Sequence, residues 1–322
     1  MSAKKQVFEY LVENKGDYVS GSQIAGELGV SRNTIWKAVK ALQEEGYAID
    51  AVSNRGYSLK EDNLRLSKEE IQRYLGITSC RMEVYETVDS TNTMMKKRAQ
   101  NGEQEGLVLI AQEQTKGRGR SGRSFYSPKD CGIYMSILLR PSLEFSKAAY
   151  LTTCAAASVA ETMDAFMDEK TQIKWVNDIY FRGKKAAGIL TEAAVDMEDG
   201  KLDYAIVGIG MNIFSPKEGY PIEIRETSAA FFETSKGREG IRNEIIARIL
   251  ERFFAYYQEL PMRNYYQSYR AKSFLLGREV LVQRGDQTWT GKAVDLDEDF
   301  HLLVERKDGT SEVLNSGEVH VR

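Results

Sequence analysis

The chain has 322 residues, enough for two or three domains, since a single hydrophobic core seldom grows beyond about 250 residues. Hydrophobic residues make up 42% and charged residues 28%, the composition of an ordinary globular protein, which excludes a disordered or fibrous chain. The net charge of −3 excludes an overall basic field, so any contact with nucleic acid must come from a local patch.

Neither a secretory signal nor a membrane-spanning segment is expected. Residues 1–16 mix lysine and glutamate with apolar residues, and no later segment approaches about 18 uninterrupted apolar residues. The three cysteines, Cys80, Cys131 and Cys154, are scattered and odd in number, which argues against a disulfide framework or a structural zinc site. We therefore expect a cytoplasmic protein with no membrane partner.

Histidine is scarce, and this limits the chemistry. The chain contains only His301 and His320, both near its end. A Ser-His-Asp or Cys-His triad, or a histidine-rich metal site, would have to be built around one of them. The sequence therefore disfavours histidine-based hydrolysis, and no metal site made of protein ligands alone is expected.

Residues 1–63 predict a small, mostly helical domain that ends in a hairpin. A short helix is expected over residues 23–28, followed by a glycine turn and a second helix over residues 31–45 with one apolar face. Residues 49–52 and 57–59 predict two short strands joined by a turn. Helix, turn, helix and hairpin in this order predict a winged helix-turn-helix domain.

Polar and basic residues gather on the second of these helices and on the wing. The amino end of such a helix contacts base edges, and nearby cations contact phosphates. A solvated face with chance charges, or a module that contacts only protein, is the alternative interpretation. The candidate DNA-binding residues are Ser31, Arg32, Asn33, Thr34, Trp36, Lys37, Lys40 and Arg55.

The rest of the chain divides into a mixed segment and an all-β segment. Residues 64–272 alternate expected strands with expected helices, the helices over residues 91–100, 147–167 and 242–257. The expected strands of this segment cover residues 107–111, 133–139, 173–175, 189–191 and 204–209. Residues 273–322 predict four short strands separated by turns, which suggests a small barrel.

The most informative motif is the loop Gly117-Arg118-Gly119-Arg120-Ser121-Gly122-Arg123. It contains a formal G-x-G-x-x-G, but no helix is expected to begin there, so the dinucleotide interpretation fails, and no P-loop motif occurs elsewhere. Guanidinium groups among glycines suit a loop that closes over a phosphate-bearing small molecule. A merely solvated loop is the alternative.

Four further motifs flank this loop, and each alone has an ordinary structural explanation. Ser90 or Thr91 could simply cap a helix, and the polar residues of Lys174-Trp175-Val176-Asn177-Asp178 could belong to a turn. A lone Lys185 would be solvated. The glycines of Gly208-Ile209-Gly210-Met211-Asn212 allow the backbone to approach a ligand closely.

Taken together and in this order, the motifs resemble those of the biotin protein ligases, and the match covers essentially the whole chain. The pattern is similar to that of the bifunctional ligases of bacteria that also repress the biotin operon. This resemblance implies an α+β multidomain protein: a winged helix-turn-helix at 1–63, a mixed α/β catalytic domain like class II aminoacyl-tRNA synthetases at 64–272, and an SH3-like β-barrel at 273–322.

The resemblance also implies roles for individual residues. Catalysis would depend on Lys185, Arg120 and Arg118. The biotin site would comprise Ser90, Thr91, Asn92, Gln114, Gly117, Arg118, Lys185 and Gly188. The site for ATP and the adenylate would comprise Arg120, Arg123, Phe125, Asn177, Asp178, Asn212 and Arg322. Two departures from the family pattern are Val176, where proline is usual, and Phe125, where tryptophan often covers the adenine.

The implied activity has two steps and a regulatory consequence. Biotin and ATP, with Mg²⁺ near Asp178, would form biotinyl-5'-AMP, which would then acylate a lysine of a biotin carboxyl carrier protein. The expected partners also include operator DNA and a second copy of the chain, with biotinyl-5'-AMP promoting the homodimer. Alternatives are a lipoate or octanoate ligase, an effector-sensing repressor without catalysis, and a ligase whose winged helix does not bind DNA.

Overall fold

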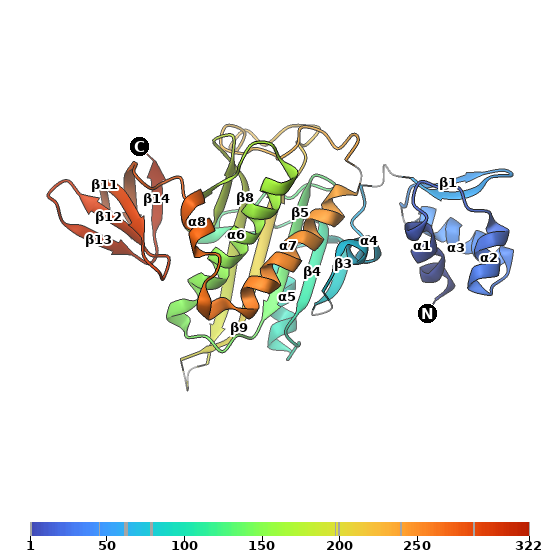
Figure 1. The fold of residues 1–322 in the computed structure, drawn as a ribbon, viewed down its shortest axis with the longest axis horizontal. Helices are drawn as coiled ribbons and strands as arrows, with labels where there is room; N and C mark the ends of the chain where they lie inside the picture. Colours follow the sequence, from blue (N-terminus) through green and yellow to red (C-terminus); the bar gives the residue numbers. More distant parts are fainter. Residues whose placement is uncertain are drawn as a thin grey trace. The chain divides into compact units, whose positions relative to one another are not determined.

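The computed structural model describes residues 2–44, 46–60, 64–77, 80–196, 198, 200–238, 240–285 and 287–321. The chain forms two compact units (Figure 1). One comprises Met1–Gly76 together with Thr234–Ala247, and the other comprises Ile77–Glu233 together with Arg248–Arg322. Among the described residues, no helix combines the length and the apolar character needed to cross a membrane.

The first unit contains the predicted helix-turn-helix and hairpin. Its elements are α1 (Ala3–Glu13), α2 (Gly21–Leu28), α3 (Arg32–Glu44), β1 (Ile49–Val52) and β2 (Gly56–Leu59), the two strands pairing antiparallel. Gly29 ends α2 in the left-handed conformation at φ 65°, and the Ser31 hydroxyl accepts a hydrogen bond from the Thr34 backbone N–H. Ile35, Val39 and other buried apolar residues of the three helices form one core. The predicted helices and hairpin are confirmed.

The same unit contains α4 (Lys68–Tyr74) and the first residues of α7 (Ile241–Gln258). A buried carboxylate holds them together: Glu70 Oε2 accepts a hydrogen bond of 2.8 Å from Asn243 Nδ2. The other oxygen, Oε1, lies 3.2 Å from Lys15 Nζ, so Glu70 also contacts the segment that follows α1. Ser67 caps α4, and its backbone N–H donates to Asn243 Oδ1.

The second unit is built on a seven-stranded sheet with the order β3-β4-β5-β9-β8-β7-β6. Only β3 and β4 are parallel, and the other neighbours are antiparallel. The strands are β3 (Arg81–Val88), β4 (Leu107–Gln114), β5 (Gly132–Leu139), β6 (Gln172–Lys174), β7 (Asp178–Phe181), β8 (Lys184–Val195) and β9 (Leu202–Asn212). Two details differ from expectation: Lys185 lies inside a strand rather than before one, and Trp175 lies beyond the end of β6.

Helices cover both faces of this sheet (Figure 1). On one face, Met95 and Ala99 of α5 (Thr91–Gln100) pack against apolar residues that include Ile206 of β9. On the other face lies α6 (Ala149–Phe166), whose Thr152 hydroxyl is 2.8 Å from the Thr191 hydroxyl of β8. Thr191 is paired with Val207 of β9. Residues 248–258 of α7 lie beside α6 and are linked to it by an ion pair of 2.8 Å between Arg252 and Glu161.

The end of the chain forms a five-stranded antiparallel sheet with the order β13-β12-β11-β10-β14. Its strands are β10 (Glu279–Arg284), β11 (Gln287–Leu296), β12 (Leu302–Arg306), β13 (Ser311–Leu314) and β14 (Glu318–Val321). The first four confirm the predicted strands, while β14 was not predicted. The short helices of the second unit are η1 (Arg120–Gly122), η2 (Phe145–Lys147), η3 (Leu260–Met262) and α8 (Tyr266–Lys272).

Candidate active site

A cavity lies on the α5 face of the seven-stranded sheet, where the sequence motifs converge. Contributing segments are the start of α5, the end of β4, the arginine-rich loop, residues 174–178, β8, β9 and the beginning of β14. Five cationic side chains line it, and two carboxylates accompany them. The cations are Arg118, Arg120, Arg123, Lys174 and Lys185, and the carboxylates are Asp178 and Glu318. This excess of positive charge favours an anionic ligand.

One end of the cavity is a network of uncharged polar groups at the start of α5. The Thr91 hydroxyl and its backbone N–H both donate to Gln114 Oε1, at 3.1 and 2.9 Å. Gln114 in turn donates to the Ser127 hydroxyl at 3.0 Å. Ser136 Oγ of β5 lies 2.8 Å from Thr91 Oγ1 and 2.6 Å from Asn92 Oδ1. Neighbouring donors and acceptors of this kind suit a small polar ring with both functions.

The arginine-rich loop, residues 117–123, is held to β8, to β14 and to Asn177 of the segment between β6 and β7. Arg118 forms an ion pair of 3.0 Å with Glu192 of β8, and Arg123 one of 2.6 Å with Glu318 of β14. The guanidinium of Arg120 donates to Asn177 Oδ1 at 2.9 Å. Within the loop, the Gly119 N–H donates to the Arg123 carbonyl oxygen, and η1 is a single turn of 3₁₀ helix. As expected, the G-x-G-x-x-G does not begin an α-helix.

The cationic centre of the cavity is Lys185. Its ammonium group lies 2.7 Å from Asp178 Oδ1, and Gly188 leaves room for it, since a Cβ on that glycine would stand 3.2 Å from Nζ. Lys174 lies in the same wall. Burial lowers the pKa of the Lys174 ammonium group below its ordinary value; the nearby Asp178 opposes this shift and Lys185 adds to it. Two amino groups beside one carboxylate can stabilise negative charge that develops between them.

The glycines of β9 allow side chains, rather than only a ligand, to approach the strand. A Cβ on Gly208 would stand 2.2 Å from Asn92 Oδ1, and one on Gly210 would stand 2.8 Å from the Phe125 ring. Both distances are shorter than any real contact of a Cβ atom. Gly208 and Gly210 therefore let Asn92 and Phe125 pack directly against β9.

Most of the residues expected at the biotin and ATP sites line this one cavity. They are Thr91, Asn92, Gln114, Arg118, Arg120, Arg123, Phe125, Asn177, Asp178, Lys185 and Gly188. Three others are not among its lining. Ser90 is buried and caps α5, accepting from the Thr93 N–H, Gly117 packs against Phe125 and Ser127, and Asn212 donates to the Ala229 carbonyl oxygen. Arg322 lies outside the described residues.

Several polar residues at the cavity were not predicted from the sequence. Ser136 and Glu192 lie within strands, and Glu318 and His320 lie on the unpredicted β14. Glu192 contacts both Asn92, at 2.9 Å, and Arg118, so it links the start of α5 to the arginine-rich loop. Polar and apolar residues do not alternate in β8, so no local sequence pattern indicated Glu192.

The candidate DNA-binding residues lie on the outer side of α3 and on the hairpin turn. Arg32, Asn33, Lys37 and Lys40 are exposed, as is Trp36 at 52%. The Lys40 ammonium lies 5.5 Å from the Trp36 ring, and the Arg55 guanidinium lies 4.1 Å from the Tyr18 ring. The buried residues of α3 point the other way, so one face of this helix is available to a partner.

Comparisons with known proteins agree with this arrangement. Residues 84–212 match the biotin/lipoate A/B protein ligase family, residues 4–58 an HTH domain, and residues 275–322 the biotin protein ligase C-terminal domain. The chain is 30% identical over 321 residues to the bifunctional ligase/repressor BirA of Bacillus spizizenii, which covers 97% of both chains. It is 27% identical to the protein of the same description from Escherichia coli, covering 95% of this chain and 94% of that one.

Solved structures of biotin protein ligases are also similar to this chain. The chain resembles a biotin protein ligase from Aquifex aeolicus in complex with biotin and ATP, with a TM-score of 0.61 and 28% identity. That similarity covers 75% of this chain and 98% of the other.

Proposed function

The chain belongs to the family of bifunctional biotin protein ligases and repressors, and from this premise we propose that it joins biotin to a carrier protein and represses biotin genes. The observation that carries the proposal is the cavity itself. An uncharged hydrogen-bonding end at Thr91 and Gln114 lies in the same cavity as the cationic centre at Lys185. Biotin has a ureido ring at one end and a carboxylate at the other, which matches this polarity.

In the first step, the biotin carboxylate attacks the α-phosphorus of ATP and expels pyrophosphate. Thr91, Asn92 and Gln114 hold the ureido ring, with Ser90 supporting the start of α5. Lys185 and the guanidinium groups of Arg118 and Arg120 stabilise the negative charge that accumulates on the α-phosphate. No histidine base is required, because the carboxylate is already a nucleophile at neutral pH.

The nucleotide occupies the other part of the cavity. Phe125 offers an aromatic face to the adenine, Arg123 lies at the loop's far end, and Asn177 and Asp178 lie beside the phosphates. Within the described ranges, no group of three or more His, Cys, Asp or Glu side chains is placed to hold a metal ion. Magnesium is usually held by one or two carboxylates and the substrate's own phosphates, so a single Asp178 fits Mg²⁺ that arrives with ATP. Bound there, Mg²⁺ would neutralise phosphate charge.

In the second step, a lysine of a biotin carboxyl carrier protein attacks the mixed anhydride and releases AMP. The anhydride is vulnerable to water, so it must be enclosed until the carrier binds. The arginine-rich loop is suited to this, because its contacts with Glu192, Asn177 and Glu318 surround the cavity.

The repressor activity would reside in the first unit. Ser31, Arg32, Asn33 and Thr34 at the start of α3 would contact bases, while Lys37, Lys40 and Arg55 would contact phosphates. A homodimer promoted by biotinyl-5'-AMP would place two such helices on one operator. Because ATP and operator DNA are both inside the cell, this function implies a cytoplasmic location.

We infer domain limits of 1–63, 64–272 and 273–322. We further infer that the central domain is related to class II aminoacyl-tRNA synthetases and that the five-stranded C-terminal sheet closes as an SH3-like barrel. The antiparallel core of the seven-stranded sheet supports the first inference, and the strand order of the C-terminal sheet supports the second.

The direct test of the ligase activity is transfer of labelled biotin. The protein is incubated with radiolabelled biotin, ATP, Mg²⁺ and a biotin carboxyl carrier domain, and covalent label on the carrier is measured after denaturing electrophoresis. We expect label only when ATP is present, and none on a carrier whose acceptor lysine is replaced by arginine. Transfer of lipoate or octanoate in place of biotin would instead establish a lipoyl-type ligase.

A separate test addresses DNA binding. Duplexes are selected from a random pool with the protein and biotinyl-5'-AMP, and affinity for the selected sequence is measured over a range of salt concentrations. Lys37→Ala should weaken binding to all sequences and reduce the salt dependence by about one counterion. Failure to select any sequence would leave a ligase without a repressor function.

A further inference from the structure

A buried aromatic residue of the C-terminal sheet lies behind the wall of the cavity. Phe300, in the turn between β11 and β12, is 1% exposed. Its φ of 61° is in the left-handed region, which bulky residues seldom adopt. Such strained conformations persist where the surroundings determine them, and they are concentrated at functional positions.

The Phe300 ring fills an aromatic box made of Tyr150, Tyr265, Tyr266 and Tyr269. It stacks on Tyr265 with ring centroids 5.3 Å apart and planes 11° from parallel. The other three rings meet it edge to face at centroid distances of 5.8, 5.4 and 5.3 Å. Both arrangements are the favourable ones for aromatic pairs, so the ring fixes the turn to α6 and α8.

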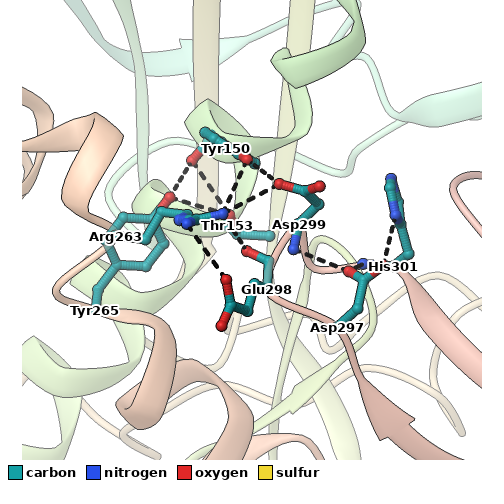
Figure 2. Close-up of polar contacts among 8 residues, drawn as sticks. All are labelled: Tyr150, Thr153, Arg263, Tyr265, Asp297, Glu298, Asp299 and His301. Atoms are coloured by element: carbon teal, nitrogen blue, oxygen red, sulfur yellow. Dashed lines mark hydrogen bonds and ion pairs between the residues drawn. The ribbon is translucent and has the colours of Figure 1, made fainter.

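Polar contacts also hold the same turn (Figure 2). The Arg263 guanidinium donates to the Glu298 carbonyl oxygen at 2.9 Å, to Asp299 Oδ1 at 3.1 Å and to the Tyr150 hydroxyl at 3.2 Å. Asp297 accepts from the His301 backbone N–H at 2.8 Å. The turn therefore has little freedom to move.

The Phe300 backbone is hydrogen-bonded to the segment of residues 174–178, which lines the cavity. Its carbonyl oxygen accepts a hydrogen bond of 2.8 Å from Trp175 Nε1, and the Tyr269 hydroxyl of the aromatic box donates to the Val176 carbonyl oxygen at 3.0 Å. Trp175 and Val176, joined by a cis peptide bond, immediately precede Asn177 and Asp178. Those two side chains contact Arg120 and Lys185 at 2.9 and 2.7 Å.

We propose that Phe300 is a positioning residue for adenylation: its ring anchors the turn in the aromatic box, and its carbonyl oxygen, through Trp175, holds Asn177 and Asp178 against Arg120 and Lys185. The C-terminal sheet thereby sets the geometry of the nucleotide part of the cavity without touching the nucleotide through this residue. The proposal rests on the proposed ligase function, in which Asn177 and Asp178 lie beside the phosphates.

Steady-state kinetics of biotin-dependent exchange between pyrophosphate and ATP test the proposal, with biotin affinity measured separately by calorimetry. Phe300→Leu keeps an apolar side chain but loses the ring contacts, and Trp175→Phe removes the donor at the other end of the link. Each variant should raise KM for ATP and lower kcat, so that kcat/KM falls by about tenfold or more. Small displacements of positioning groups are costly for catalysis. Biotin affinity should fall less than kcat/KM for ATP, because Thr91, Asn92 and Gln114 come from other elements and the Phe300 link reaches the biotin site only at Lys185.

The double variant separates positioning from simple destabilisation. If Phe300 acts through Trp175, Phe300→Leu should have no further effect in the Trp175→Phe background, whereas independent effects would multiply. Phe145→Leu, at a phenylalanine that is 58% exposed, is the matched control and should match the wild type. Multiplying effects, an unchanged KM for ATP, or an equal loss of biotin affinity would overturn the proposal. Absence of exchange in the wild type would instead refute the ligase function.

Discussion

Lys184 and Lys185 are adjacent in the chain but face different surroundings. Lys185 Nζ lies in the cavity, 2.7 Å from Asp178 Oδ1. Lys184 Nζ lies 3.8 Å from Glu226 Oε2, and the Lys184 side chain is 42% exposed. A cation placed where negative charge develops stabilises mainly the transition state of the reaction. An exposed ion pair contributes little to the free energy of folding.

This contrast gives a prediction with an internal control. Lys185→Ala should slow biotin-dependent pyrophosphate exchange by about 100-fold or more, the usual loss for one charge-stabilising group. Lys184→Ala should stay within about twofold of the wild type, because its ion pair is exposed. Thermal unfolding of both variants checks that neither loss reflects misfolding. Comparable losses in the two variants would mean that the charge of β8, rather than Lys185, matters.

Glu192 gives a second prediction for a single residue. Its carboxylate accepts from Asn92 Nδ2 at 2.9 Å and pairs with Arg118 at 3.0 Å, so it tethers the arginine-rich loop in the ligand-free protein. Glu192→Gln should weaken this tether and make the loop several-fold more sensitive to trypsin without ligand. Biotin and ATP together should restore protection, since the adenylate phosphate supplies a new partner for the loop. Glu113→Gln, at a residue whose carboxylate accepts from the Thr87 hydroxyl at 3.0 Å, should leave digestion unchanged.

Single residues were predictable only where a motif surrounded them. Arg118, Arg120 and Lys185 stood in recognisable patterns, and all three line the cavity. Ser136 could not be found, because it lies in an apolar run typical of a buried strand. Its position beside Thr91 and Asn92 depends on how β5 pairs with β9, where Ser136 lies opposite Gly208. Strand register depends on the whole sheet and cannot be predicted from the local sequence.

At the scale of elements, α4 contains a buried carboxyl group, Glu70, whose pKa is shifted. Burial raises the pKa of the Glu70 carboxyl above its ordinary value of 4.5, and the nearby Lys15 and Arg73 and the hydrogen bond from Asn243 only partly offset it. The folded chain therefore holds a proton at pH values where the unfolded chain has released it. The stability contributed by this group is greatest below pH 4.5 and is lost as pH rises through the folded-state pKa.

Comparison with Glu70→Gln, which cannot titrate, isolates this effect. The unfolding free energy of the wild type minus that of the variant should decrease as pH rises from about 5 to about 8. Urea unfolding of both proteins at each pH gives the difference directly. A difference that is constant with pH, or that grows, would show that Lys15 compensates fully for the burial of the carboxylate.

Elements were predicted well where they were long and periodic. The helices α5, α6 and α7 and the strands β4, β5 and β9 all coincide with predicted segments. The seven residues of α4 and the four of β14 are too few to show a period. The edge strand β3 was missed because charged residues interrupt its apolar positions, as is common where one edge of a strand faces solvent.

At the scale of the whole molecule, the family was predictable because its motifs occur in a fixed order along the chain. What the order could not reveal is how the C-terminal sheet serves the active site. Glu318 meets Arg123, and Phe300 meets Trp175, across more than a hundred residues of sequence in each case. These contacts belong to the folded molecule, and no local pattern marks them.

The two activities can be coupled through the arginine-rich loop. Residues 1–60 carry eight basic and seven acidic residues, so we expect one winged helix to make few phosphate contacts and to bind DNA weakly. Two copies on a palindromic site would add their contacts. Two of the contacts that hold the loop are ion pairs in which Arg118 is 46% and Arg123 is 65% exposed, and such pairs contribute at most about 1 kcal/mol each. We therefore expect the phosphate of the adenylate to hold the loop more firmly.

When biotinyl-5'-AMP binds, the loop loses conformational entropy at that step. The ordered loop then offers a pre-formed surface to a second copy of the chain. We therefore predict that the adenylate strengthens both self-association and operator binding, by about 1–3 kcal/mol of coupling free energy. Arg118→Gly, which removes the contact with Glu192, should reduce this coupling more than it reduces the DNA affinity of the ligand-free protein. Sedimentation and operator titration, each with and without the adenylate, measure the two quantities, and Lys184→Ala serves as the control for loss of a nearby cation. If operator affinity is the same with and without the adenylate, the loop does not transmit the state of the ligase to the DNA-binding unit.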